Sequence, residues 1–332
     1  MKKILLTLPV LALALCACTY ELDYISDRDT ELIVLNAMLR TDQTEHVVWL
    51  SESRCDGILQ LSDAQLRCYV NGTLVAEAEE TPEEITRVAG KYVFSAEIRP
   101  GDEVRLEASY KKLKAQATAI APVPALLAGV DTASLARSPY YFSGKYDCPT
   151  LSCKLRLQDI PDQPNWFRIH VHYDEMGLED PFHQLYEHSI NFDFNQDPIL
   201  CDGNPQPLKI DAYQELISAL SRETAYCKFR DSEFADKTAE VEIQIRKTEF
   251  DYFKYVLFKP DGTSMTRVKN LHIDFLSISK EEYDYLVQNE KANTDGDFEL
   301  YREPVHLPSN VEGGLGFFSI ASPSTRTIRI ED

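Results

Sequence analysis

Several features that would assign this sequence to a common class of protein are missing. After Leu15, no stretch approaches the ~20 consecutive apolar residues that a transmembrane helix needs. Basic residues are scarce, because 34 Lys and Arg stand against 54 Asp and Glu, and the formal net charge is -20. Such an acidic surface repels phosphate backbones, so nucleic acid is not an expected partner.

Catalytic and metal-binding motifs are missing as well. The sequence has no G-x-S-x-G nucleophile elbow and no H-E-x-x-H helix. No C-x2-C pair with matching histidines is present, which argues against zinc. The glycine-rich stretch at 313–316 lacks the lysine and the following helix of a phosphate-binding loop. We therefore expect a protein that is not an enzyme and holds no cofactor, with a degradative hydrolase as the third alternative.

The chain begins with an export signal. Two lysines and an apolar run from Ile4 to Leu15 form a signal peptide over residues 1–17, too short to stay in a membrane. Leu15-Cys16-Ala17-Cys18 resembles a bacterial lipobox and predicts lipidation, as by palmitate, at Cys18. Cys16 is the poorer alternative because bulky Leu15 precedes it, and an ordinary secretory signal with incidental cysteines is a further one. Several acyl chains would anchor the chain permanently, with residues 18–30 as a surface tether.

An even number of cysteines follows Cys18. In an exported chain, six cysteines favour disulfides, and six allow 15 connectivities. Nearest-neighbour pairing would join Cys55 to Cys68, Cys148 to Cys153, and Cys201 to Cys227.

Residues 31–121 have the alternation of a β-sandwich. Apolar residues alternate along Leu32–Leu39 and His46–Ser51, and further short strands follow at turn-separated intervals. Asn71-Gly72 lies between two apolar runs, which is a strong hairpin signal. About seven short strands predict an immunoglobulin-like sandwich, although the cysteine, tryptophan, cysteine order of antibody domains is absent.

A proline-rich linker at 122–125 precedes a second β-rich domain at 126–332. Trp166–Tyr173 alternates clearly, and Ala239–Arg246 and Leu271–Ile278 are further expected strands. Ser279-Lys280-Glu281-Glu282 is a capping box, which predicts one helix, and residues 208–220 are expected to be partly helical. The glycines at 313–316 predict a close approach of two backbones or positive φ angles.

Several of these features together resemble a family of Bacteroidota outer-membrane lipoproteins, domain of unknown function 4249. They are the lipobox with Glu21 and Asp23, the first strand, Tyr69-Val70-Asn71-Gly72, and the 229–234 segment. They continue with the strand and helix at 276–286, and with Glu303-Pro304-Val305 leading to the glycine-rich segment. The turn after Phe234 lacks the glycine usual in that family. The resemblance implies a lipid-anchored outer-membrane protein facing the cell exterior that works beside TonB-dependent transporters, with no assigned catalytic residues.

Two clusters are candidate sites. Tyr140, Tyr141, Phe142 and Tyr146 lie in a loop-like stretch, where they would bind a sugar or a protein partner, or pack onto the sandwich. His170 and His172 project from one face of a strand and are the nearest metal candidates, although an ordinary polar sheet face is the favoured interpretation. We expect no metal.

These observations lead to one preferred function and one alternative. The preferred one is a surface-exposed lipoprotein that serves as a non-catalytic accessory or binding subunit of a TonB-dependent nutrient uptake system. The alternative is a free-standing adhesin or glycan-binding module that uses the loop at Tyr140–Tyr146.

Overall fold

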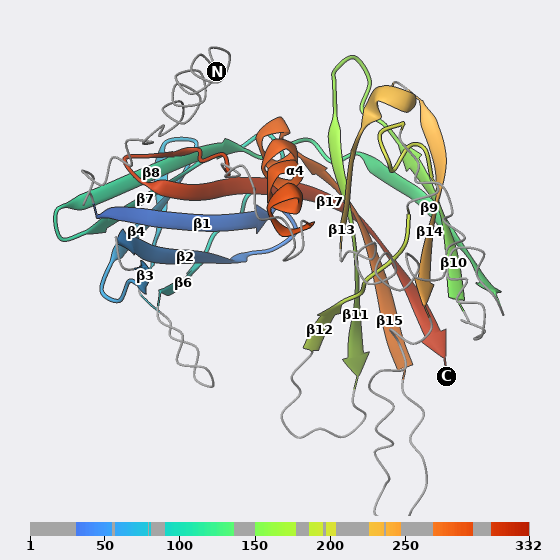
Figure 1. Ribbon diagram of the computed structural model, residues 1–332, viewed down its shortest axis with the longest axis horizontal. Coiled ribbons are helices and arrows are strands. Elements are labelled where there is room, and N and C mark those ends of the chain that lie inside the picture. The colour runs from blue at the N-terminus through green and yellow to red at the C-terminus, as the bar shows by residue number, and fades with distance from the viewer. Residues whose placement is uncertain are drawn as a thin grey trace, which may run out of the picture.

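The computed structural model describes two lobes side by side (Figure 1). The described residues are 31–54, 57–78, 80, 90–135, 150–176, 186–194, 197–203, 226–235, 237–246, 268–294 and 307–331. The expected signal peptide, the tether and the helical segment at 208–220 lie outside these residues. The fold is mainly β, as the alternating sequence predicts.

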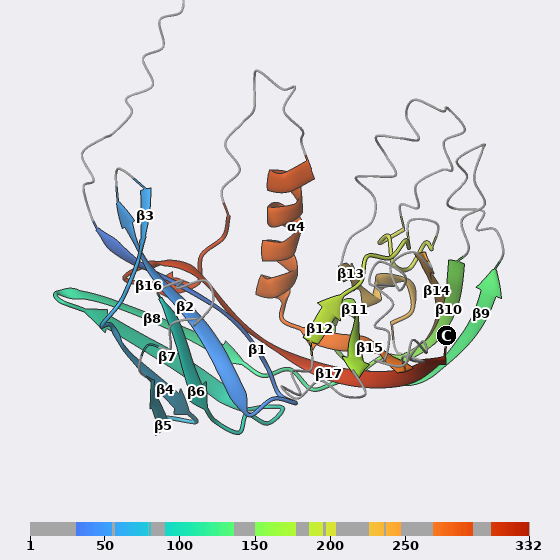
Figure 2. The same cartoon turned by 90° about the horizontal axis from the view of Figure 1, so that it is seen from below.

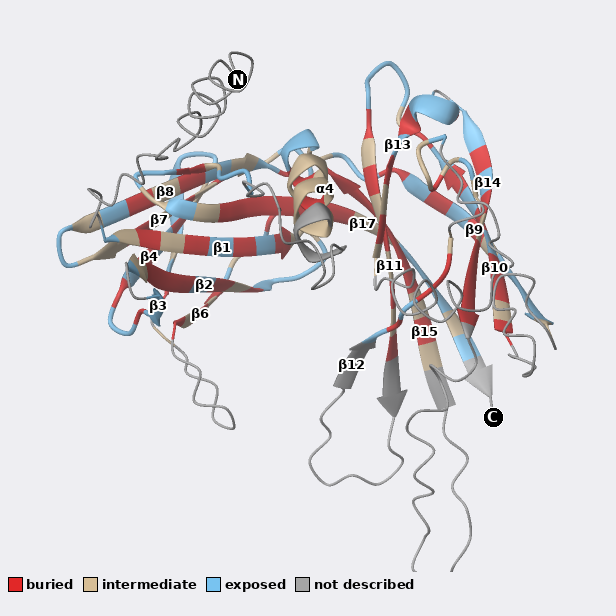
Figure 3. Cartoon of the chain, viewed as in Figure 1, coloured by how far each residue is buried: buried red, intermediate tan, exposed pale blue. Residues whose placement is uncertain are grey.

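The first lobe is a sandwich of two sheets. One layer has the strand order β16 (Val311–Glu312), β8 (Leu113–Ile120), β7 (Glu103–Tyr110), β4 (Gln65–Val70) and β5 (Thr73–Ala78). The other layer contains β1 (Leu32–Arg40), β2 (Glu45–Arg54), β3 (Gly57–Gln60), β6 (Lys91–Ser95) and the first part of β17 (Leu315–Glu331). Buried residues alternate with more exposed ones along β1, β6 and β7 (Figure 3). This lobe confirms the predicted sandwich.

The Asn71-Gly72 hairpin is confirmed. Both residues have positive φ, +50° and +77°, as a tight hairpin turn between twisted strands requires. The Asn71 side chain adds to the turn, because its Oδ1 accepts a hydrogen bond from the Glu103 amide at 3.0 Å.

The second lobe packs a three-stranded sheet onto the remainder of the large one. The small sheet has the order β14 (Thr238–Arg246), β10 (Thr150–Gln158) and β9 (Leu126–Leu135). Facing it are β11 (Trp166–Met176), β12 (Tyr186–Ser189), β13 (Tyr226–Arg230), β15 (Val268–Ile278) and the second part of β17. Aromatic rings fill the space between the two sheets, and the Phe167 ring lies 4.7 Å from that of Phe275 and 5.6 Å from that of Phe229.

The strand β17 belongs to both lobes. Residues 315–321 pair in parallel with 34–40 of β1, and residues 322–331 pair antiparallel with 268–277 of β15. One sheet therefore runs through the whole molecule in the order β12-β11-β15-β17-β1-β2-β3, and β17 passes beneath the helix that stands between the lobes (Figure 2). The chain crosses between the lobes at 122–125, and it returns to the first lobe at 311–321, where it pairs with β8 and β1.

The glycine-rich segment lets the chain change sheets. It leaves β16 in one layer of the first lobe and enters β17 in the other. Gly316 has a φ of +109°, and a Cβ added there would overlap the carbonyl oxygen of Leu35. Asn310 closes this crossing, because its side chain donates to the Phe318 carbonyl at 2.7 Å and accepts from the Phe318 amide at 2.9 Å. Both the expected close approach and the expected positive φ are confirmed.

The helix α4 (Lys280–Thr294) stands between the lobes. The Ser279 hydroxyl accepts a hydrogen bond from the Glu282 amide at 3.1 Å, which confirms the predicted cap. Leu286 packs on residues of β15 and β17. The Tyr285 ring stacks on Phe317 with centroids 4.3 Å apart. The helix therefore contacts the shared strand as well as the second lobe.

Among the described residues, no helix has the length and apolar character needed to cross a membrane.

Candidate functional sites

Part of the expected site lies outside the described residues. This applies to Cys18, to Cys55 and Cys148, and to the aromatic loop with Tyr140, Tyr141, Phe142 and Tyr146. Their predicted roles remain predictions.

The described cysteines differ from expectation. Cys68, Cys153, Cys201 and Cys227 carry free thiols, so the expected bond between Cys201 and Cys227 is absent from the structure. Each of these two thiols points at a carbonyl instead, Cys201 at Phe194 and Cys227 at Leu200, both at 3.5 Å. Burial raises the pKa of Cys153 to about 12 and that of Cys227 well above its ordinary value, which keeps both thiols protonated at neutral pH.

The histidine pair predicted from β11 is part of a larger cluster. His170 and His172 share one face, and the register places Asp274 and His272 of β15 opposite them. The His172 ring centroid lies 5.2 Å from that of His170 and 4.8 Å from that of His272. Hydroxyl groups border the cluster, because Ser189 lies 3.0 Å from a His170 nitrogen and Thr327 lies 3.0 Å from a His272 nitrogen.

Asp274 is the buried charge at the centre of this cluster. Its side chain has no exposed surface, and it accepts hydrogen bonds from Arg40 at 2.7 Å and Thr325 at 2.6 Å. Burial alone would raise the pKa of Asp274. The neighbouring His170 and Arg40 and the Thr325 hydroxyl outweigh this and hold the pKa well below its usual range. Because the His170 nitrogen is 3.9 Å away, beyond hydrogen-bond distance, we regard Arg40 as the dominant partner.

The cluster does not form a metal-binding arrangement. Within the described residues, no group of three or more His, Cys, Asp or Glu side chains could hold an ion. The rings of His170, His172 and His272 lie beside one another, and Asp274 is already bound by Arg40. We therefore describe it as a polar cluster that links the end of β1 to the second lobe.

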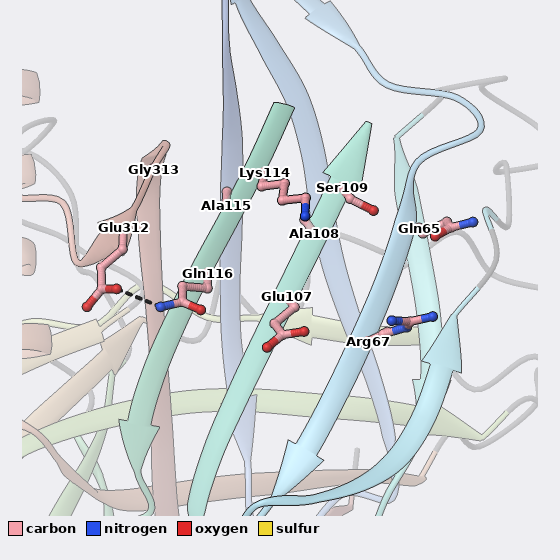
Figure 4. A pocket seen from close by; sticks show the side chains of 10 residues that line it. All are labelled: Gln65, Arg67, Glu107, Ala108, Ser109, Lys114, Ala115, Gln116, Glu312 and Gly313. Atoms are coloured by element: carbon pink, nitrogen blue, oxygen red, sulfur yellow. Dashed lines mark hydrogen bonds between the residues drawn. The ribbon is translucent and has the colours of Figure 1, made fainter. Parts of the chain in front are cut away.

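A second site, which the sequence did not indicate, lies on the outer face of the five-stranded sheet. It is a groove of about 490 Å³ whose side chains form two rows across the strands (Figure 4). The register places Gln65, Ser109 and Lys114 in one row. The second row contains Arg67, Glu107, Gln116 and Glu312. We call this site the polar groove.

The two rows of the polar groove differ in their internal contacts. In the second row, Arg67 binds Glu77 at 2.8 Å, Glu107 accepts from Arg105, and Gln116 donates to Glu312 at 2.6 Å. In the first row, the side chains of Gln65, Ser109 and Lys114 make no hydrogen bond or ion pair in the part of the chain that the structure describes. The first row is therefore the part that is available to a ligand.

Sequence reasoning missed the polar groove because no motif marks it. Strand alternation predicts which residues of β4 and β7 face outward. It does not predict that β4, β7, β8 and β16 become neighbours, because β16 is separated from β8 by about 190 residues in the chain.

The fold and these sites define a class: a two-lobed, mainly β protein with one strand common to both lobes. The family described as "Domain of unknown function (DUF4249)" matches residues 18–327, and the chain belongs to this family. No curated protein matches the sequence.

One solved structure, "Biofilm associated protein - BSP domain", is similar with a TM-score of 0.20 and 7% identity. The similarity covers 91% of this chain and 59% of that chain. A likeness this distant carries no argument about function.

Proposed function

We propose that this protein is a lipid-anchored, non-catalytic binding subunit that works at the outer membrane, facing the cell exterior, beside a TonB-dependent transporter. The observation that carries the proposal is the lipobox-like sequence ending in Cys18. The family match begins at the same residue, which the lipobox would make the first of the mature chain. The acidic residues Glu21 and Asp23 resemble an export signal to the cell surface.

The arrangement of the two lobes supports a binding role. The shared strand β17 joins them through one continuous sheet, so the protein presents a single body to a partner. In the view of Figure 2, the lobes flank α4 on the concave side of this sheet. We take the concave side of this sheet as the face that docks against another protein.

The test is co-purification. The full-length protein, tagged at its C-terminus, is extracted in mild detergent and its partners are identified by mass spectrometry, with Cys18→Ala as the control. We expect a transporter to accompany the wild type, and we expect Cys18→Ala to be lost from the membrane fraction. Recovery of the lipoprotein without a transporter would contradict the accessory role. Membrane association that persists in Cys18→Ala would contradict the lipid anchor.

A further inference from the structure

The polar groove has the size of a small-molecule site, but its described residues form no apolar walls. Its volume of about 490 Å³ falls within the range of about 300–1,000 Å³ that is typical of ligand sites. Ala108 and Ala115 also border the groove, but both belong to the core of the sandwich, so the described side chains that face the groove are polar or charged. An apolar ligand would cover these polar groups without replacing their hydrogen bonds to water, which is costly. The groove therefore suits a polar ligand.

The charges of the described residues that line the groove cancel. Arg67 and Lys114 carry two positive charges, and Glu107 and Glu312 carry two negative ones. A polyanion would meet both carboxylates, and a polycation would meet both basic groups. Electrostatic complementarity therefore favours a ligand without net charge.

The first row supplies the groups that can bind such a ligand. Gln65, Ser109 and Lys114 follow one another across three strands, and cross-strand neighbours lie about 4.5–5.5 Å apart. The amide and the hydroxyl both donate and accept hydrogen bonds, and the ammonium group donates three. Figure 4 shows Lys114 extending from β8 toward β7, where Ser109 lies. A molecule with several hydroxyl groups can satisfy all three side chains at once.

We propose that the polar groove binds the end of a neutral glycan, one or two sugar units long. Lys114, Ser109 and Gln65 are its direct hydrogen-bond partners, and the second row holds the shape of the groove through its own contacts. No aromatic ring is among the described residues that line the groove, so recognition depends on hydrogen bonds, and we expect weak binding by a single chain end.

This inference deepens the binding role proposed above without requiring the transporter. Glycan binding can fail while the co-purification succeeds, and the reverse is equally possible. The two proposals are therefore distinguished by separate experiments on the same full-length protein.

In the experiment, many copies of the detergent-solubilised full-length protein are attached to each bead, so that weak contacts with a glycan add up. The beads are applied to an array of neutral, sialylated and sulfated glycans, and the best neutral glycan is then titrated by calorimetry. Lys114→Ala removes a direct partner, and Lys112→Ala removes the same charge from the exposed turn beside the groove. Ser109→Trp fills the groove with a bulky ring, and circular dichroism verifies that every variant is folded.

We expect retention of at least one neutral glycan. Lys114→Ala weakens the affinity about tenfold, which is the usual effect of removing one hydrogen bond to a charged group. Ser109→Trp abolishes binding, and Lys112→Ala leaves it unchanged. Three outcomes would overturn the proposal: no neutral glycan is retained, acidic glycans alone are retained, or Lys114→Ala and Lys112→Ala behave alike.

Discussion

The ion pair between Arg40 and Asp274 offers a sharp test of how the two lobes are joined. Arg40 ends β1 in the first lobe, and Asp274 lies in β15 of the second, with β17 between them. Asp274→Asn keeps the size of the side chain and removes its charge. Arg40 then retains one carboxylate partner, Asp42 at 2.8 Å, which is partly exposed.

The burial of the pair determines the expected cost. Asp274 is fully buried and the Arg40 side chain is 16% exposed, and removing one partner of a buried pair typically costs about 3–5 kcal/mol. Because Asp42 still compensates Arg40, we expect the lower end, about 3 kcal/mol. At roughly 2 °C per kcal/mol for a chain of this length, the Tm falls by about 6 °C.

The assay is urea unfolding followed by fluorescence and circular dichroism, with Asp42→Asn as the matched control. That control removes an exposed carboxylate from the same arginine and should cost at most about 1 kcal/mol. The double variant Arg40→Met, Asp274→Leu should recover part of the loss, because neither charge is then buried alone. An Asp274→Asn variant within about 0.5 kcal/mol of the wild type would refute the reasoning, since that is the range of ordinary surface substitutions.

The pH dependence gives a second measure of the same pair. The pKa of Asp274 is held below its usual range in the folded state, and in the unfolded chain it is about 3.9. Its stabilising contribution is therefore complete above about pH 4 and is lost as the pH falls through the folded pKa. The stability difference between wild type and Asp274→Asn should narrow as the pH falls below 4.

Three further predictions concern the first lobe and the cysteines. Gly316→Ala should lower the free energy of unfolding in urea by about 3 kcal/mol or more, because the added Cβ meets the Leu35 carbonyl oxygen. Gly72→Ala should lower it by about 1 kcal/mol, because the added Cβ there meets open space. Equal costs would contradict the close approach at Gly316. Tyr92→Phe should cost about 1–3 kcal/mol, because the buried hydroxyl bridges two backbone groups at 2.9 and 3.0 Å, and an unchanged midpoint would contradict this. The four described thiols should react with an alkylating reagent only after unfolding, because burial raises their pKa values. Mass spectrometry that finds Cys227 bonded to Cys201 would contradict this and would restore the disulfide expected from the sequence.

Local structure was largely predictable from the sequence, because it depends on neighbouring residues. Strand alternation predicted Leu32–Leu39, and β1 occupies Leu32–Arg40. Asn71-Gly72 forms the expected turn, because these residues accept positive φ at little cost. The helix cap at Ser279 was equally predictable, because its hydrogen-bond partner Glu282 lies only one helical turn away in the sequence.

Long-range pairing was not predictable from the same patterns. The parallel partner of β1 lies about 280 residues further along the chain, and no local period records it. The histidine cluster shows the same limit, because His170 and His172 were found by their spacing, whereas His272 joins them only through the register of β11 with β15. The polar groove combines residues of four strands. Taken alone, each of these residues resembles an ordinary outward-facing position of a strand.

The strand β17 also has a consequence for how the protein is made. During synthesis β1 emerges about 280 residues before its parallel partner at 315–321. The first lobe therefore cannot close its large sheet until that partner is available, and pairing over such a separation is slow. A newly made chain would spend this interval with the unpaired edge of β1 exposed, which invites aggregation. Removing residues after 310 should therefore impair the folding of both lobes, although the deleted segment is only about 20 residues long.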